Sequence, residues 1–240
     1  HEIKVMKNVK ITPHGTYKEE RVEKPALSDV YSMIVPLNIE EKDYEVPFIK
    51  GDTVSLENVN ETAKEFLFSP LLKNLRDKIF VNTNRLSDFN ELSLYQNLAI
   101  INSRPNIWNG TVRDNVTSFG LITEEQAQVF IESLGLSEVI KKMPNGLDTL
   151  ISAEIESTIS QEVKALIYIT RKLALEPEII VLNEFESSIG RESYSKVFSY
   201  ISSIRDSKII FINSKDRNIL NLCNRDILNN RIGEVETFLI

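Results

Sequence analysis

Short runs of consecutive apolar residues recur along the chain and predict buried strands. They lie at residues 79–81, 98–101, 179–182 and 209–212. Continuous apolar runs are typical of parallel strands that are covered on both faces, whereas half-exposed strands alternate apolar and polar residues. The last three runs are each followed by an asparagine, which is Asn102, Asn183 or Asn213. The pattern predicts an α/β fold with a mostly parallel sheet.

Helical signals occupy the segments between these runs. Thr123 and Gln126 form a capping box that predicts a helix through Leu134, which Gly135 would end. From Ser160 onward apolar residues recur at helical spacing, and this pattern stops just before strand 179–182. Residues 193–204 predict a further helix before the last strand. A helix that leads through a short turn into a buried strand is half of a βαβ unit, which supports a parallel sheet.

The ends of the chain suggest antiparallel strands, at 3–11 and at 226–239. The sequence contains no repeat, linker or low-complexity segment. We therefore expect one domain over residues 1–240. Its core lobe would comprise about 1–104 and 160–240, and a helical subdomain would occupy about 105–159.

Composition and charge exclude several classes of function. The net charge of −7 and the absence of a Lys/Arg run argue against a nucleic-acid surface. No apolar run approaches the ~18 residues that a membrane-spanning helix needs. The 8 glycines are all at least ten residues apart, so the chain has no glycine-rich phosphate loop.

Several segments resemble the ATP-binding cassette domains of ABC exporters. Residues 97–116, NLAIINSRPNIWNGTVRDNV, are similar to the stretch around the family's Q-loop, and MPNGLDT at 143–149 is similar to the text before its signature motif. Residues 160–184 keep the spacing from the signature serine to the catalytic glutamate. Segments 2–11 and 77–88 also resemble the family, in the correct order. The resemblance implies the ABC-type P-loop NTPase-like fold, with N-terminal antiparallel strands and a helical insertion subdomain.

The resemblance also assigns positions to the family's ATP site. Glu184 takes the position of the catalytic glutamate. Three further positions carry residues that differ from the family pattern: Asn183 for the Walker B aspartate, Ser103 for the Q-loop glutamine, and Ser214 near the switch histidine. In the signature motif Ser160 is kept, but Gln161 and Glu162 stand in place of its two glycines. Only His1 and His14 are histidines, far from Ser214. We interpret Glu162 as a favourable carboxylate in the first turn of a helix.

The segment that corresponds to the phosphate loop, residues 48–66, has one glycine and no Gly-Lys pair. We interpret its Lys50 and Lys64 as solvated surface lysines. Pro13 stands near the position of the adenine-stacking aromatic residue, with Tyr17 close by. A micromolar nucleotide site represents about −8 kcal/mol, and each charge-assisted hydrogen bond contributes roughly 1.5–3 kcal/mol. The missing lysine, loop N–H groups, metal carboxylate and adenine-stacking ring together remove an amount comparable to this whole binding free energy. We therefore expect neither ATP nor Mg²⁺ as a cofactor, and no ATPase activity of the usual kind.

The resulting hypothesis is a degenerate cassette domain at the cytoplasmic face of a membrane transporter. It would dock on the transmembrane domain of the same or an associated transporter, and pair with another cassette as a homodimer or heterodimer. The family implies that Trp108, Asn109 and Arg113 contact the transmembrane domain, although Trp108 could equally be buried in the helical insertion. A divergent ATPase half that binds ATP and Mg²⁺ with a partner cassette is the alternative. A free-standing scaffold or regulator is a third possibility.

Overall fold

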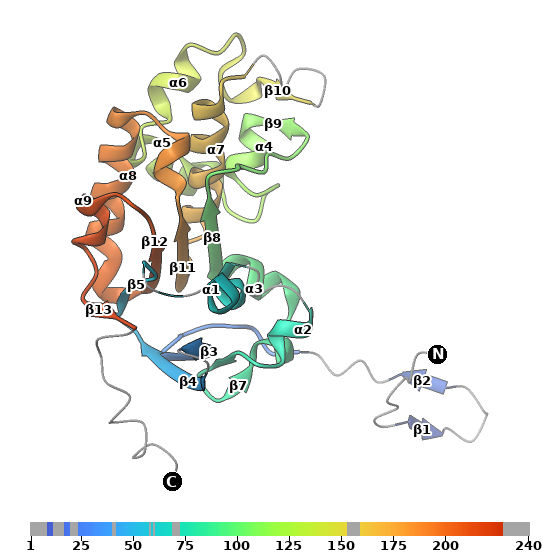
Figure 1. The fold of residues 1–240 in the computed structure, drawn as a ribbon. Helices are drawn as coiled ribbons and strands as arrows, with labels where there is room; N and C mark the ends of the chain where they lie inside the picture. Colours follow the sequence, from blue (N-terminus) through green and yellow to red (C-terminus); the bar gives the residue numbers. More distant parts are fainter. Residues whose placement is uncertain are drawn as a thin grey trace.

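A computed structural model describes residues 9–11, 17–19, 24–39, 42–57, 59, 61–68, 73–152 and 159–227. Its central element is a five-stranded sheet in the order β13-β5-β12-β11-β8, in which every neighbouring pair is parallel (Figure 1). The strands are β5 (Thr53–Ser55), β8 (Leu98–Asn102), β11 (Ile179–Asn183), β12 (Ile209–Asn213) and β13 (Arg225–Asp226). The three apolar runs that end in asparagine are therefore neighbouring parallel strands, as the sequence predicted.

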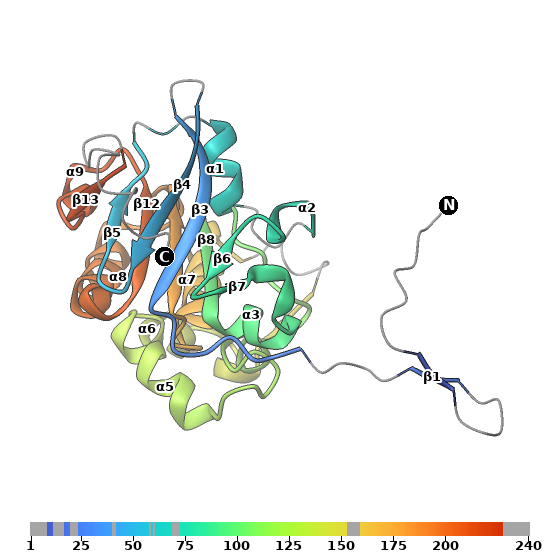
Figure 2. The same cartoon turned by 90° about the horizontal axis from the view of Figure 1, so that it is seen from below.

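A four-stranded antiparallel sheet lies beside the parallel one (Figure 2). It contains β4 (Lys42–Ile49), β3 (Ser32–Ile39), β6 (Phe80–Val81) and β7 (Asn84–Arg85) in that order. The apolar run at 79–81 belongs to this sheet, so its assignment to a parallel sheet was wrong. The pair β3–β4 was not predicted, although Met33, Val35 and Leu37 alternate with less buried positions. A proline within each strand, which normally argues against a sheet, obscured the signal.

The antiparallel strands predicted for the chain ends meet different outcomes. β1 (Val9–Ile11) pairs antiparallel with β2 (Tyr17–Glu19), whereas residues 3–8 lie outside the described residues. At the other end, β13 runs parallel to β5 at Asp226, the first residue of the span predicted to be antiparallel, and the prediction for the rest of that span is not tested. The chain returns to the sheet through α9 (Arg217–Leu220), and this crossover gives β13 the direction of its neighbours. Residues 228–239 are outside the described part.

The parallel strands bury their two faces in two different cores. Ile179, Val181, Ile209 and Phe211 face the antiparallel sheet and α1 (Glu61–Phe68). The alternate residues Ile180, Leu182, Ile210 and Ile212 face α7 (Gln161–Leu173) and α8 (Arg191–Ile204). Side chains of a strand point alternately to opposite faces, so a sheet buried on both sides must be apolar throughout. This explains the uninterrupted apolar runs in the sequence.

A helical segment follows β8 and forms a third core. It comprises the two-stranded pair β9 (Gly110–Thr111) and β10 (Leu150–Ile151), with α4 (Val112–Val116), α5 (Glu124–Ser133) and α6 (Ser137–Lys141). The predicted capping box of Thr123 and Gln126 is confirmed at the start of α5. Helix α7 joins this segment to the rest, because its Leu166 and Ile167 pack among these helices and its Leu173 packs against the parallel sheet. The predicted division into lobes stays a prediction.

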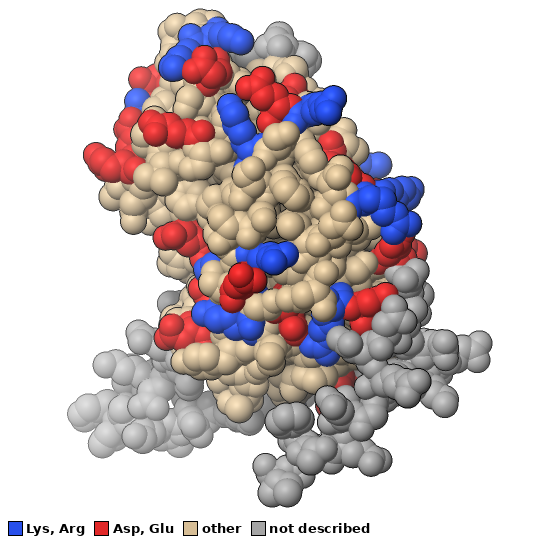
Figure 3. Space-filling view, turned by 90° about the vertical axis from the view of Figure 1, so that its left-hand side faces the viewer, with Lys and Arg blue, Asp and Glu red and all other residues tan. Residues whose placement is uncertain are grey.

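Six further short elements complete the described fold. They are α2 (Lys73–Arg76) and α3 (Glu91–Asn97), with single 3₁₀ turns at Leu86–Asp88, Gly146–Asp148, Phe185–Ser188 and Arg205–Ser207. None of the described helices is long and apolar enough to cross a membrane. On the face seen in Figure 3, basic and acidic side chains are interspersed and no basic patch forms.

Candidate functional site

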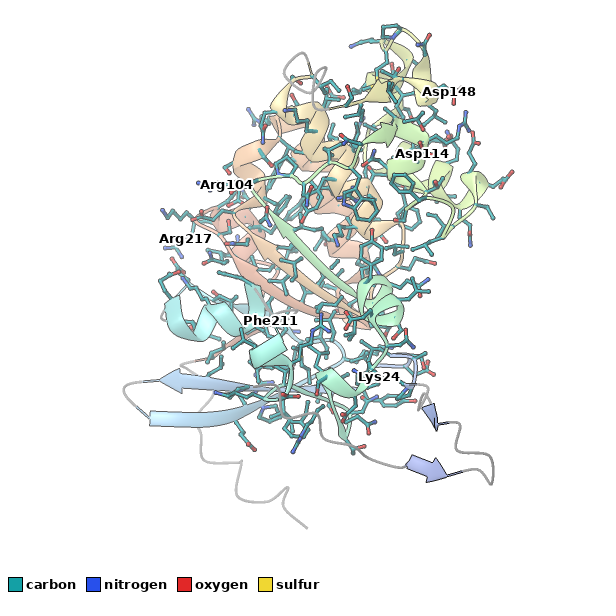
Figure 4. The ribbon with its side chains drawn as sticks, turned by 90° about the vertical axis from the view of Figure 1, so that its right-hand side faces the viewer. Lys24, Arg104, Asp114, Asp148, Phe211 and Arg217 are labelled. Carbon is teal, nitrogen blue, oxygen red and sulfur yellow. The ribbon has the colours of Figure 1, made fainter. Side chains whose placement is uncertain are left out.

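The three asparagines that follow the buried strands lie side by side at the carboxyl edge of the parallel sheet. Asn183 is in register with Asn102 on one side and with Asn213 on the other. The side-chain amide of Asn213 donates to Oδ1 of Asn183 at 2.7 Å, and Oδ1 of Asn102 accepts from the backbone N–H of Arg104 at 3.0 Å. Figure 4 shows Arg104 and Arg217 at this same end of the sheet. The side-chain oxygens of Asn183 and Asn102 therefore both accept hydrogen bonds from within the chain.

Glu184 directly follows Asn183 and turns the chain out of the sheet. Its backbone is left-handed, with φ of 49°, and its N–H donates to the carbonyl of Asn213 at 2.8 Å. A left-handed conformation is uncommon for a residue other than glycine, and it directs the chain into the 3₁₀ turn 185–188. The Glu184 side chain is exposed. The Glu184 carboxylate therefore lies exposed at the edge of the sheet.

Ser214 is buried, and its hydroxyl both donates and accepts a hydrogen bond within the chain. It donates to Glu186 in a short hydrogen bond and accepts from the backbone N–H of Asp216 at 2.9 Å. Nearby, burial raises the pKa of Tyr194, and the carboxylates of Asp216 and Glu186 add to this effect. Ser214 therefore links the turn after β11 to the start of α9.

The lysines of the phosphate-loop segment are both tied to glutamates. Lys64 lies in α1 with only 9% of its side chain exposed, and its ammonium contacts Oε1 of Glu61 at 2.9 Å. Its interpretation as a solvated surface lysine was therefore wrong, because its stem is buried where α1 packs onto the core. Lys50 contacts Glu178 at 2.9 Å and is more exposed. Pro13 lies outside the described residues, and only the backbone of Tyr17 is described.

The start of α7 holds the positions assigned to the signature motif. Ser160 caps the helix, because its hydroxyl accepts from the N–H of Val163 at 3.3 Å. Glu162 lies in the first turn, as interpreted, but its carboxylate reaches across to α8. Its Oε1 accepts from the backbone N–H of Gly190 and from the hydroxyl of Ser193, each at 2.9 Å. Glu162 thus serves as an anionic cap for a second helix, a role the sequence pattern did not reveal.

The segment after Asn102 carries the proposed docking residues. Ser103 is half-buried and Asn109 is exposed. Arg113 forms ion pairs with Glu124 and Asp148, the latter at 3.0 Å. Trp108 is half-buried, with its ring 5.7 Å from that of Tyr95 and 5.6 Å from that of Phe119.

A buried arginine holds Trp108 in place. Arg171 is 1% exposed, and its guanidinium carbon lies 4.0 Å from the centre of the Trp108 ring, a favourable cation–π distance. Its Nη1 donates to Oδ1 of Asn115 at 2.9 Å, and its Nη2 donates to the carbonyl of Asn106 in a short bond. Burial lowers the pKa of Arg171. Arg171 lies within the segment 160–184 that resembles the family, but its partners come from other elements and could not be read from the sequence.

Asn115 completes this arrangement from α4. It is fully buried, and its Oδ1 also accepts from the N–H of Trp108 at 3.0 Å. Its side-chain N–H groups donate to the carbonyls of Trp108 at 2.9 Å and Thr111 at 3.0 Å. The residue therefore forms four hydrogen bonds, which fix the loop between β8 and α4. Within the described part of the chain, no three His, Cys, Asp or Glu residues are grouped so that they could hold a metal ion.

Comparisons with known proteins agree with the fold. No protein-family model matches the chain. It is 24% identical over 219 residues to the alpha-factor-transporting ATPase of Saccharomyces cerevisiae, covering 89% of this chain and 17% of that protein. It is 32% identical over 127 residues to the ABC-type transmembrane transporter verA of Clonostachys rogersoniana, covering 51% and 10%. The aligned part makes up 28% or less of the length of such relatives.

A solved structure of a bacterial Atm1-family ABC exporter with ATP bound shares the fold. The TM-score is 0.63 at 16% sequence identity, and the match covers 82% of this chain and 37% of that chain. The predicted ABC-type α/β fold is therefore confirmed, with its parallel sheet, flanking helices and antiparallel strands. The resemblance to the nucleotide-binding domains of ABC exporters is likewise confirmed, in sequence and in fold.

Proposed function

We propose that this chain is a cassette domain of an ABC exporter that has lost ATP binding and acts as a docking and pairing domain. The observation that carries this proposal is the hydrogen bond from Asn213 to Asn183. The resemblance assigns the Asn183 position to a metal-binding aspartate. Here a neutral amide stands in its place, and its oxygen already accepts a hydrogen bond from the side chain of Asn213.

The other groups at this edge do not fit Mg²⁺ and a triphosphate. A phosphate cradle requires converging backbone N–H groups and an available lysine. Instead, Lys64 is paired with Glu61, and Glu57 brings another carboxylate 3.3 Å from Arg217. A magnesium ion would need hard, anionic oxygen ligands, whereas Asn183 supplies a neutral amide oxygen, and the nearby carboxylates of Glu57 and Glu186 are engaged by Arg217 and Ser214. ATP and Mg²⁺ are therefore not cofactors in this proposal.

The start of α7 supports the same conclusion for a nucleotide held by a partner cassette. In the family, the signature motif of one cassette contacts the nucleotide bound to the other. In this chain the Ser160 hydroxyl caps its own helix, and the Glu162 carboxylate is engaged with α8. A carboxylate at that position would also repel a γ-phosphate. In this proposal, neither the phosphate-loop segment nor the start of α7 is suited to bind a nucleotide shared between two cassettes.

The partner in this proposal is the transmembrane domain of the same or an associated exporter, at the cytoplasmic face of the membrane. Its contact surface is the segment that includes Trp108, Asn109 and Arg113, which we call the docking segment (residues 105–116). Trp108 is only half-buried although Arg171 and Asn115 fix it rigidly. A rigid, partly exposed aromatic residue is well suited to a protein interface. Pairing with a second cassette, identical or different, would be independent of nucleotide.

Two experiments test the two parts of the proposal. Calorimetric titration of Mg-ATP into the purified chain should give no binding heat up to millimolar nucleotide, with or without magnesium. A micromolar, magnesium-dependent isotherm would refute the loss of ATP binding. Crosslinking from Asn109→Cys in the full transporter should capture the transmembrane domain, whereas Glu125→Cys on the exposed face of α5 should not. Equal crosslinking from both positions would refute the docking segment.

The alternative of a divergent ATPase half rests on the exposed carboxylate of Glu184 at the sheet edge. It predicts that adding an intact partner cassette produces ATPase activity that Glu184→Gln abolishes. The proposal of a non-catalytic domain predicts that Glu184→Gln leaves the activity of the mixture unchanged.

A further inference from the structure

An apolar and aromatic surface surrounds Trp108, and we call it the aromatic patch (Leu92, Tyr95, Trp108 and Phe119). Leu92 is 52% exposed and lies one turn before Tyr95 on α3, while Phe119 is 54% exposed beside Trp108. The rings of Tyr95 and Trp108 are stacked, and the hydroxyl of Tyr95 lies 3.3 Å from that of Ser118. These contacts make the patch continuous across α3 and the loops on both sides of α4.

Two cations lie directly under this patch. Arg171 packs beneath Trp108, and the Lys172 ammonium lies 4.6 Å from the centre of the Tyr95 ring. Among the described residues, neither cation forms a salt bridge with a carboxylate. The titratable groups that face Lys172 are Arg171 and, across the patch, Tyr95 on α3, while Tyr168 faces Arg171. The described part of the chain therefore leaves two adjacent positive charges without an anion.

This arrangement is electrostatically incomplete. Burial is the main cause that lowers the pKa of Lys172 to about 8, and repulsion from Arg171 is the second cause. A buried cation without an anionic partner is costly, and a carboxylate brought to it from outside would relieve that cost. The lysine is half-buried, so its ammonium lies close to the surface that a partner would cover.

We propose that the segment that docks on the aromatic patch presents an Asp or Glu side chain to Lys172. This inference rests on the proposed docking function and specifies the chemistry of the partner. The occupant is an amphipathic helical segment of the transmembrane part, with apolar residues against Leu92 and Phe119 and one carboxylate at Lys172. A small free anion would satisfy the charge but would leave the exposed apolar side chains uncovered. The combination of exposed apolar area and unpaired positive charge therefore favours a protein segment.

The test uses the intrinsic fluorescence of Trp108, which is the only tryptophan of the chain. Two capped amphipathic helical peptides with Leu and Phe on one face are titrated, identical except for one Glu or Gln beside that face. At pH 7 the Glu peptide should bind about five- to tenfold more tightly, because a charge-assisted contact forms at a partly buried cation. Lys172→Met should remove the difference, and Lys172→Arg should retain it. Lys141→Met, on exposed α6, is the matched control and should behave as wild type.

The outcomes separate this inference from the docking proposal. Equal binding of the two peptides to the wild type would overturn the carboxylate contact and leave docking intact. A Glu preference that persists in Lys172→Met would also overturn it, because another cation would then be responsible. If neither peptide changes the Trp108 fluorescence, both the contact and the patch as a docking surface are refuted. In the wild type the preference should shrink between pH 7 and pH 9 as Lys172 loses its proton, and Lys172→Arg should show no such loss.

Discussion

The carboxyl edge of the parallel sheet and the docking segment both depend on asparagine side chains, yet they use them differently. At the sheet edge, half-buried Asn183 and Asn213 share one hydrogen bond in a region where the exposed Glu184 has no enclosed site around it. In the docking segment, fully buried Asn115 makes four hydrogen bonds that hold a tryptophan and an arginine. The comparison shows that the hydrogen-bond network around Asn115 is larger and more deeply buried than the bond between Asn183 and Asn213.

The largest difference between the two regions is expected when Asn115 and Asn213 are each replaced by alanine and the two variants are compared. Asn115→Ala should lower the free energy of unfolding by about 2–4 kcal/mol, because buried donors and acceptors on Trp108, Thr111 and Arg171 lose their partners. Asn213→Ala should cost about 1 kcal/mol or less, since its single bond lies in a half-buried position. Urea unfolding followed by Trp108 fluorescence measures both values. Equal losses for the two variants would contradict the difference between the regions.

Lys172→Met should stabilise the chain by about 1–3 kcal/mol at pH 7, because it removes a poorly solvated charge and keeps the apolar stem. In the folded chain the pKa of Lys172 is about 8, below the ordinary value of 10.5 that the unfolded chain has. Between these values the unfolded chain holds more protons, so wild-type stability rises with pH and the advantage of the variant shrinks. Urea unfolding at pH 7 and pH 9.5 tests this.

The control for the lysine prediction is Lys141→Met, at a fully exposed lysine paired with Glu138. This variant should gain no stability at pH 7. If Lys172→Met proves destabilising at both pH values, the lysine would have a favourable partner that the account does not include.

Glu162→Gln should lower the free energy of unfolding by about 0.5–1 kcal/mol, because a neutral side chain interacts less favourably with the N-terminus of α8. Glu192→Gln in the first turn of the same helix, where the side chain is exposed, should have a smaller effect. Amide hydrogen exchange at Gly190 provides a local measurement, and it should accelerate in Glu162→Gln alone. Unchanged exchange would show that the carboxylate does not protect that N–H group in solution.

Asn183→Asp should have the smallest effect, within about 0.5 kcal/mol of the wild type, since the new carboxylate still accepts from Asn213. It should not restore Mg-ATP binding, because the lysine and the phosphate cradle are missing as well. Calorimetry on this variant tests that expectation. Micromolar Mg-ATP affinity would indicate that the single aspartate is all that the site lacks.

The sequence predicted those parts of the fold that depend on local pattern. The runs ending at Asn102, Asn183 and Asn213 are buried on both faces, so their composition alone identifies parallel strands. The cap of α5 and the start of α7 follow from short motifs. The strands β3 and β4 were missed because prolines interrupt them, and the direction of β13 depends on a crossover that no local signal encodes.

The candidate site was only partly predictable for a related reason. The positions of the family's site residues were assigned from the resemblance, and these assignments stay predictions. The partners of Lys64, Glu162 and Arg171 come from other elements, and only the folded chain brings them together.

The central claim is that the carboxyl edge of the sheet binds no nucleotide. It is tested most directly by a ¹⁵N–¹H NMR titration with Mg-ATP that follows the side-chain amides of Asn183 and Asn213, with the Trp108 indole as internal reference. The account predicts that the two amide signals stay unchanged up to millimolar nucleotide. Saturable, magnesium-dependent shifts of these amides at micromolar concentrations would contradict it.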